Sequence, residues 1–223
     1  MGFLAASLVV GGSSGTVSPE AASGSTRTTN ALQVTLTLFS VSTFAGSGPI
    51  GSADGVRSAA RFWEPKAVAL DPQGNLYVAD YNNQSIRKIT TGGAVTTLAG
   101  SGIVGHVDGP GVTATFDHDL WLTADLNGIV YVADSGNDAI RKITAAGVVS
   151  TLAGGAAFGF TNGNVTSGKF NYPHGIAVSQ NGNLYVTDFS NNVIRKITHD
   201  GTVSTYAGTS IQGAADGDRK SVV

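Results

Sequence analysis

The sequence repeats itself every 54 residues, and this period constrains the fold more than any other feature. Four T-x-A-G motifs lie one period apart, and no gap is needed to align them; they begin at Thr43, Thr97, Thr151 and Thr205. In the same register, segments of the type L-Y-V-A-D end at Asp80, Asp134 and Asp188, and I-R-K-I-T segments begin at Ile86, Ile140 and Ile194. An ungapped period of this length indicates one supersecondary unit repeated in tandem.

Each unit reads as four short strands. In the first unit these are expected at Ala67–Asp71, Leu76–Asp80, Ser85–Thr90 and Val95–Ala99, separated by polar or Gly-containing turns. Glycine occurs 31 times and charged residues make up only 13% of the chain, a composition typical of short strands joined by tight turns rather than of long helices. The pattern therefore predicts an all-β fold, a β-propeller of four-stranded antiparallel blades.

The stretch from Pro65 to Ile89, P-x-x-V-A-x-D-x-x-G-N-L-Y-V-A-D-x-x-N-x-x-I-R-K-I, resembles the NHL repeat. The resemblance extends from Val41 to about Gly217, with two departures in the second unit: Asp119 and Leu120 stand where the other units have Pro65–Lys66 and Pro173–His174, and Trp121 stands where they have Ala67 and Gly175. It implies a propeller but no single function, because NHL propellers include protein-binding, RNA-binding and lyase members.

The repeat predicts three complete blades, at about 66–100, 120–154 and 174–208, within a propeller region of 41–217. Val41–Ala45 is expected to be a leading strand, because it matches the fourth strand of a blade. Residues 1–30 are expected to be disordered or to form a signal or leader segment, and residues 218–223 to start a further repeat. Because a closed propeller needs about four blades or more, we expect an incomplete propeller that self-associates or requires additional blades.

A candidate binding site lies where each first strand begins. These residues share one face with the long connections and the loops between second and third strands, and they differ from blade to blade. They are Trp63, Glu64 and Lys66 in the first blade, Asp117, His118 and Asp119 in the second, and Asn171, Tyr172 and His174 in the third. We therefore expect this loop face to bind a protein, or a small-molecule or glycan ligand, and the chain to act as a scaffold rather than an enzyme.

Each blade also carries an Asp and an Arg at matched spacing across one hairpin. The expected structural ion pairs are Asp80 with Arg87, Asp134 with Arg141, and Asp188 with Arg195. The alternative is that the three Arg form an exposed stripe for an anion or RNA. The Asx-Gly pairs that begin at Asp54, Asp108, Asn162 and Asp216 are interpreted as ordinary turns.

Other functions are less well supported. The formal net charge of −2 and the mixed charges at the mouth do not favour nucleic acid, and the absence of Cys removes disulfides and thiolate metal sites. The apolar run Met1–Gly12 is too short to span a membrane, so no transmembrane segment is expected. The runner-up function is a metal-dependent lyase or hydrolase that uses His118 and His174 with Asp117 and Asp119. No cofactor is expected, and the sequence does not fix the compartment, although it is compatible with secretion.

Overall fold

The computed structural model describes residues 40–118, 120–155 and 157–213, so the expectations for residues 1–30 and 218–223 lie outside the described residues. The chain divides into Met1–Val41 and Ser42–Val223, and every described strand belongs to the second part. In that part the described helical elements are all three-residue 3-10 turns, and no described helix is long and apolar enough to cross a membrane.

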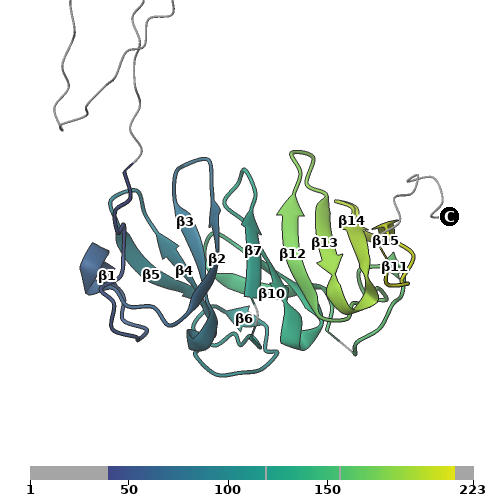
Figure 1. Ribbon diagram of the computed structural model, residues 1–223, viewed down its shortest axis with the longest axis horizontal. Coiled ribbons are helices and arrows are strands. Elements are labelled where there is room, and N and C mark those ends of the chain that lie inside the picture. Colours follow the sequence, from purple (N-terminus) through teal and green to yellow (C-terminus); the bar gives the residue numbers. More distant parts are fainter. Residues whose placement is uncertain (1–39, 119, 156, 214–223) are drawn as a thin grey trace, which may run out of the picture. The chain divides into compact units, whose positions relative to one another are not determined.

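The all-β prediction is confirmed: the described strands form three antiparallel sheets, each corresponding to one repeat (Figure 1). From the inside outward, the strands of blade 1 are β2 (Pro65–Leu70), β3 (Leu76–Asp80), β4 (Ser85–Ile89), β5 (Ala94–Ala99) and β1 (Gly55–Val56). Those of blade 2 are β7 (Leu120–Ala124), β8 (Val130–Asp134), β9 (Ala139–Ile143), β10 (Val148–Gly154) and β6 (Gly109–Pro110). Those of blade 3 are β12 (Pro173–Val178), β13 (Leu184–Asp188), β14 (Val193–Ile197), β15 (Thr202–Ala207) and β11 (Gly163–Asn164).

Two expectations about the strands need correction. Each sheet has five strands rather than four, because the long connection returns to the outer edge and adds a two-residue strand there, such as Gly55–Val56 beside Ala94–Val95. The expected leading strand at Val41–Ala45 is not a strand. A fourth strand needs the third strand of its own blade as a partner, and the described residues contain no such strand before β1.

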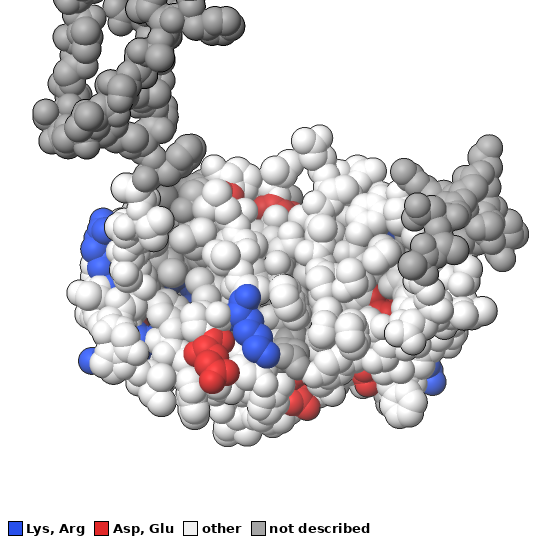
Figure 2. Space-filling view, viewed as in Figure 1, with Lys and Arg blue, Asp and Glu red and all other residues white. Residues whose placement is uncertain are grey.

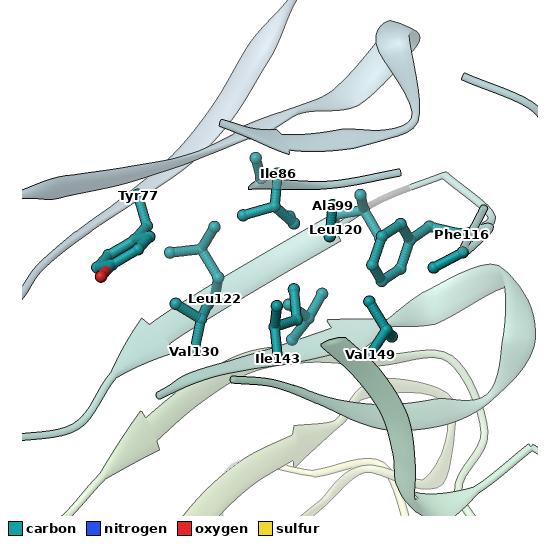
Figure 3. Close-up of a cluster of buried hydrophobic side chains, with 12 residues drawn as sticks. Tyr77, Ile86, Ala99, Phe116, Leu120, Leu122, Val130, Ile143 and Val149 are labelled. Carbon is teal, nitrogen blue, oxygen red and sulfur yellow. The ribbon is translucent and has the colours of Figure 1, made fainter. Parts of the chain in front are cut away.

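The inner strands β2, β7 and β12 lie side by side, so the blades pack face to face through their sheets (Figure 1). The hydrophobic core therefore lies between blades. Between blades 1 and 2, Tyr77 and Ile86 of the first blade are fully buried in one cluster with Phe116, Leu120 and Leu122 of the second (Figure 3). Burial on both faces explains why the strands read as nearly continuous apolar runs.

The surface carries few charges. Figure 2 shows Lys or Arg and Asp or Glu side chains scattered over one face of the molecule, with no broad patch of a single sign. This distribution matches the low charged fraction of 13% and gives no basic surface on this face of the kind that binds nucleic acid.

The turns between second and third strands have the same geometry in every blade. Each is a 3-10 turn, Tyr81–Asn83, Ser135–Asn137 or Phe189–Asn191, and each ends at a residue in the left-handed region. Those residues are Gln84 (φ 49°), Asp138 (φ 52°) and Asn192 (φ 56°). Asn and Asp tolerate this conformation well, and the shared geometry points the side chains of this position in the same direction in every blade.

Candidate functional site

Each blade contains a buried Asp–Arg pair at the predicted positions. The Nη1 atom of Arg87 lies 2.7 Å from Asp80 Oδ2, that of Arg141 lies 2.7 Å from Asp134 Oδ2, and that of Arg195 lies 2.9 Å from Asp188 Oδ2. All six side chains are fully buried. The guanidinium groups therefore do not form an exposed stripe, and the residues that read as a possible anion site are part of the interior.

The Asx-Gly positions are more than turns. In blade 1 the Nη2 atom of Arg87 donates to Asp54 Oδ1 at 2.7 Å, and Thr97 N donates to Asp54 Oδ2 at 3.1 Å. Asp108 and Asn162 accept from Arg141 and Arg195 in the same way, at 2.6 and 2.9 Å. The Phe that recurs in each repeat packs against the Arg of its blade. Each guanidinium carbon lies over this Phe ring; in blade 2, for example, Arg141 Cζ lies 5.2 Å from the centre of the Phe116 ring.

Burial raises the pKa values of these carboxyl groups and the contacts lower them, and the balance differs between the outer and the buried positions. Burial acts to raise the pKa of Asp54 and Asp108, but hydrogen bonds from the arginines and from Thr97 or Thr151 outweigh it and hold both pKa values below 3.8. At Asp134, burial dominates and raises the pKa to about 6, although Arg141 pairs with it. The outer carboxylates therefore stay ionised over a wider pH range than the buried one.

The buried Asp also shapes the mouth of the loop face. Its second oxygen accepts the backbone N–H of the residue that opens the inner strand: Trp63 to Asp80 at 2.8 Å, Asp117 to Asp134 at 2.9 Å, and Asn171 to Asp188 at 2.8 Å. The next residue is left-handed in each blade; these residues are Glu64 (φ 53°), His118 (φ 36°) and Tyr172 (φ 56°). Each buried Asp thus binds both its Arg and the backbone of a candidate binding residue.

A second set of hydrogen bonds joins neighbouring blades at the same level. Gln84 Oε1 of blade 1 accepts the N–H of His118 at 2.9 Å, and Asp138 Oδ1 of blade 2 accepts the N–H of Tyr172 at 2.7 Å. In blades 1 and 2, the left-handed residue that ends the 3-10 turn therefore holds the mouth of the following blade. This arrangement keeps the loop face rigid, which suits a binding surface.

Between blades 1 and 2 the mouth is amphipathic. Lys66 Nζ lies 3.4 Å from the centre of the Tyr81 ring, and Tyr81 meets the His118 ring edge-on at 5.5 Å. His118 Nδ1 lies 2.7 Å from Asp117 Oδ1. The charges of this cluster therefore already interact with one another or with an aromatic ring.

Between blades 2 and 3 the mouth is aromatic. His174 stacks on Phe189 at 4.8 Å and on Trp121 at 6.1 Å, and it contacts Tyr172 at 5.0 Å. Phe189 is 61% exposed and Trp121 is 38% exposed, whereas Tyr172 and His174 are half-buried. We call Trp121, Tyr172, His174 and Phe189 the aromatic cluster.

The other expected site residues are distributed as follows. Trp63 is 40% exposed and Glu64 is exposed at the mouth of blade 1, while Asn171 is half-buried and anchored through its backbone. Asp119 lies outside the described residues. Among the residues that are described, no three His, Cys, Asp or Glu side chains lie close enough together to hold a metal ion.

Sequence reasoning missed Tyr81, Trp121 and Phe189 as members of the mouth. Tyr81 and Phe189 begin turns between second and third strands, and Trp121 is a departure from the repeat in the first strand of the second blade. The available signal was an aromatic residue at the first position of the same turn in two of the three blades. Exposed aromatic residues in a turn are unusual enough to mark a surface for attention.

The three sheets have the topology of β-propeller blades, and the same contacts join the first to the second and the second to the third. Together they form an open arc of a β-propeller. The NHL repeat family profile matches residues 62–89 and 170–197. The chain belongs to the NHL-repeat family.

Two curated relatives extend this comparison. The chain is 31% identical over 166 residues to Protein SUPPRESSOR OF QUENCHING 1, chloroplastic, of Arabidopsis thaliana, covering 69% of this chain and 16% of that protein. It is 34% identical over 168 residues to NHL repeat-containing protein 2 of Homo sapiens, covering 68% of this chain and 23% of that protein. The chain thus spans less than a quarter of the length of either relative.

Among solved structures, a protein of unknown function from Bacteroides thetaiotaomicron VPI-5482 matches with a TM-score of 0.53 and 25% sequence identity. The match covers 66% of this chain and 36% of that one. The similarity supports the propeller fold.

Proposed function

We propose that this chain is a recognition scaffold that binds a protein, or a small-molecule or glycan ligand, through the loop face. The observation that carries the proposal is the aromatic cluster, in which exposed Phe189 and Trp121 stack on half-buried His174. Large aromatic side chains dominate the energetics of binding surfaces, because they bury much apolar area at little conformational cost.

The surroundings support this proposal. The backbone beneath the cluster is fixed by the bonds of Asn171 to Asp188 and of Tyr172 to Asp138. The mouth between blades 1 and 2 adds polar groups from Lys66 and Asp117 to the loop face. An apolar platform with a few fixed polar groups around it is the usual composition of a ligand site.

The chain provides its own reporter for a test. Its two Trp residues, Trp63 and Trp121, are both partly exposed at the mouth, so Trp fluorescence, excited selectively over that of the six Tyr residues, reports on the loop face. We would screen a panel of oligosaccharides and an array of peptides for a change in this fluorescence, and then titrate each hit against two variants.

Phe189→Ala should weaken binding of a hit by about tenfold or more, which corresponds to about 1.4 kcal/mol. Leu126→Ala is the matched control, because Leu126 is also 61% exposed but lies in the turn between β7 and β8, at the other end of blade 2. Binding that both variants retain in full, or that both lose equally, would contradict the proposal.

A further inference from the structure

The chain contains two Asn-x-Ser/Thr sequons, and the structure places their Asn side chains in opposite environments. They are Asn83-Gln84-Ser85, at the turn between β3 and β4, and Asn164-Val165-Thr166, which begins at the end of β11. Such a sequon is the acceptor for N-glycosylation, which attaches an oligosaccharide to the Asn side chain. Because the sugar replaces a hydrogen on Nδ2, the exposure and the hydrogen bonds of that nitrogen decide whether a folded chain can carry it.

Asn83 uses its side-chain nitrogen to hold its blade together. Asn83 Nδ2 donates to Gly51 O at 2.7 Å and to Asp80 Oδ2 at 2.8 Å, so both of its hydrogens are bonded. Asn137 and Asn191 make the same two bonds in blades 2 and 3. A sugar on Asn83 would break one of these bonds beside the fully buried carboxylate of Asp80.

The sequon at Asn83 depends on a single residue. Ser85 completes it, but Ala139 and Val193 stand at this position in the other two blades. The Asn therefore recurs for its structural bonds. Ser85, which is itself buried, adds the motif without making the acceptor nitrogen accessible.

Asn164 has the opposite arrangement. Its Oδ1 atom accepts from Thr166 Oγ1 at 2.6 Å, from Thr166 N at 3.1 Å and from Ser167 N at 3.0 Å, which closes the turn after β11. The residue is exposed, and its Nδ2 atom has no hydrogen bond to any described residue. A sugar on Nδ2 therefore leaves all three bonds to Oδ1 in place.

The repeat itself does not require this Asn. Val56 and Pro110 stand at the position of Asn164 in blades 1 and 2. In blade 1 the turn that follows is the 3-10 turn Arg57–Ala59, and no side chain caps it. The exposed sequon is thus an addition to blade 3 that the fold of the other two blades does without.

The turn that carries Asn164 lies away from the loop face. Asn164 pairs with Thr202, the first residue of β15, and Val165 N donates to Gly201 O in the turn between β14 and β15. The turn Phe189–Asn191, between β13 and β14, belongs to the opposite end of the blade. In addition, β11 is the outermost strand of its sheet (Figure 1). An oligosaccharide here would cover a sheet edge whose unpaired backbone groups could otherwise pair with another chain.

We propose that Asn164 is an N-glycosylation site of this chain, and that Asn83 stays unmodified in the folded protein. In a eukaryotic secretory compartment, Asn164 Nδ2 attacks C1 of the first sugar of a lipid-linked oligosaccharide diphosphate. The bond between Nδ2 and C1 forms, the bond from C1 to the diphosphate oxygen breaks, and Nδ2 loses one proton as the lipid diphosphate leaves. The oligosaccharide shields the outer edge of blade 3 and leaves the aromatic cluster open. This inference does not rest on the proposed function.

The test expresses the full chain behind a cleavable signal peptide in cultured human cells. The mass of the secreted protein is measured before and after digestion with N-glycosidase F, which converts a glycosylated Asn to Asp. The wild type should carry one oligosaccharide, and digestion in water enriched in heavy oxygen should label position 164 alone. Thr166→Ala should abolish the modification although it keeps Asn164, and Thr166→Ser should retain it.

Ser85→Ala is the matched control. It removes the other sequon, keeps Asn83 and reproduces the Ala139 of blade 2, so the mass of the attached oligosaccharide should not change. An unmodified wild type would overturn the proposal, as would an oligosaccharide that Ser85→Ala removes from the secreted protein. Chain retained inside the cells is digested in the same way, and there too the absence of label at Asn164 would overturn the proposal.

A second measurement tests the placement of the sugar. The glycosylated and the digested wild type should have the same thermal midpoint, because neither the sugar on Nδ2 nor the Asp left by digestion removes the acceptor oxygen of the turn. A lower midpoint for the glycosylated protein would contradict the placement at this exposed turn.

Discussion

Replacing Arg141 with Ala should destabilise the protein far more than an exposed ion pair would suggest. Its guanidinium donates to Asp134 Oδ2 at 2.7 Å and to Asp108 Oδ1 at 2.6 Å, and to the carbonyl oxygens of Thr115 and Val107, both at 3.1 Å. The variant leaves the fully buried carboxylate of Asp134 without its counter-charge. Breaking a buried pair from one side costs about 3–5 kcal/mol, a large share of the stability of an ordinary domain.

The matched control is Asp108→Asn. The side chain of Asp108 is 46% exposed, and an Asn at this position can still accept from Arg141, as Asn162 accepts from Arg195 at 2.9 Å in blade 3. The control should therefore lose less than about 1 kcal/mol, the usual value of an exposed ion pair. Both variants would be compared with the wild type by urea unfolding followed by circular dichroism, at one protein concentration.

The loss in Arg141→Ala should also depend on pH. Burial already raises the pKa of Asp134 to about 6 in the wild type, and removing Arg141 takes away an interaction that lowers it. A carboxyl group whose pKa is higher in the folded state than in the unfolded state is destabilising above the folded pKa, and recovers as pH falls towards the unfolded value. Asp134 takes up its proton at a higher pH in the variant than in the wild type. The difference between their free energies of unfolding should therefore shrink as the pH is lowered from about 8 to about 5. The reasoning fails if Arg141→Ala and Asp108→Asn lose the same stability, or if the difference is constant with pH.

Three further predictions follow from single contacts. Phe116→Ala should cost about 3–5 kcal/mol in urea unfolding, because the ring is fully buried between blades 1 and 2; a loss below about 1 kcal/mol would contradict this packing. The pKa values of Asp54 and Asp108 are lowered, so their contribution to stability is present above pH 3.8 and is lost as the pH falls through their pKa values in the folded state. When both residues are replaced by Asn, the urea midpoint should therefore fall less on acidification than in the wild type. Gly100→Ala should lower the thermal midpoint more than Gly48→Ala: both have positive φ, but only at Gly100 would the new Cβ lie 2.2 Å from a carbonyl oxygen, and equal losses would refute the clash.

The sequence predicted the strands closely where the repeat alone defines them. Leu76–Asp80 has the expected bounds, since turn residues flank an alternating apolar run on both sides. The first strand begins two residues earlier than expected, at Pro65, because Pro65 pairs directly with Asp80 before an irregularity in the register. It ends before Asp71, whose carboxylate accepts from Asn75 N at 2.8 Å and closes the turn.

The candidate site was predictable only in outline. Strand order places the openings of the inner strands and the turns after the second strands at one end of each blade, so the face could be derived from the repeat. The contact of His174 with Trp121 and Phe189 joins residues from two blades and two kinds of segment. The period aligns equivalent positions of different blades, but it carries no information about which non-equivalent positions touch.

The sequence by itself determined the repeating unit, because an ungapped period with alternating apolar residues predicts one β-sheet per repeat, with each sheet packed against the next. It also determined which Asp faces which Arg, because a short hairpin fixes that distance locally. Only the tertiary structure decided what each Arg does with its remaining donors. Arg87 reaches Asp54 from 33 residues away because the connecting segment folds back over its own blade, and this return path depends on packing rather than on any local pattern. Burial of the whole guanidinium followed from that path, and it turned a residue that could have met a ligand into one that holds the blade together.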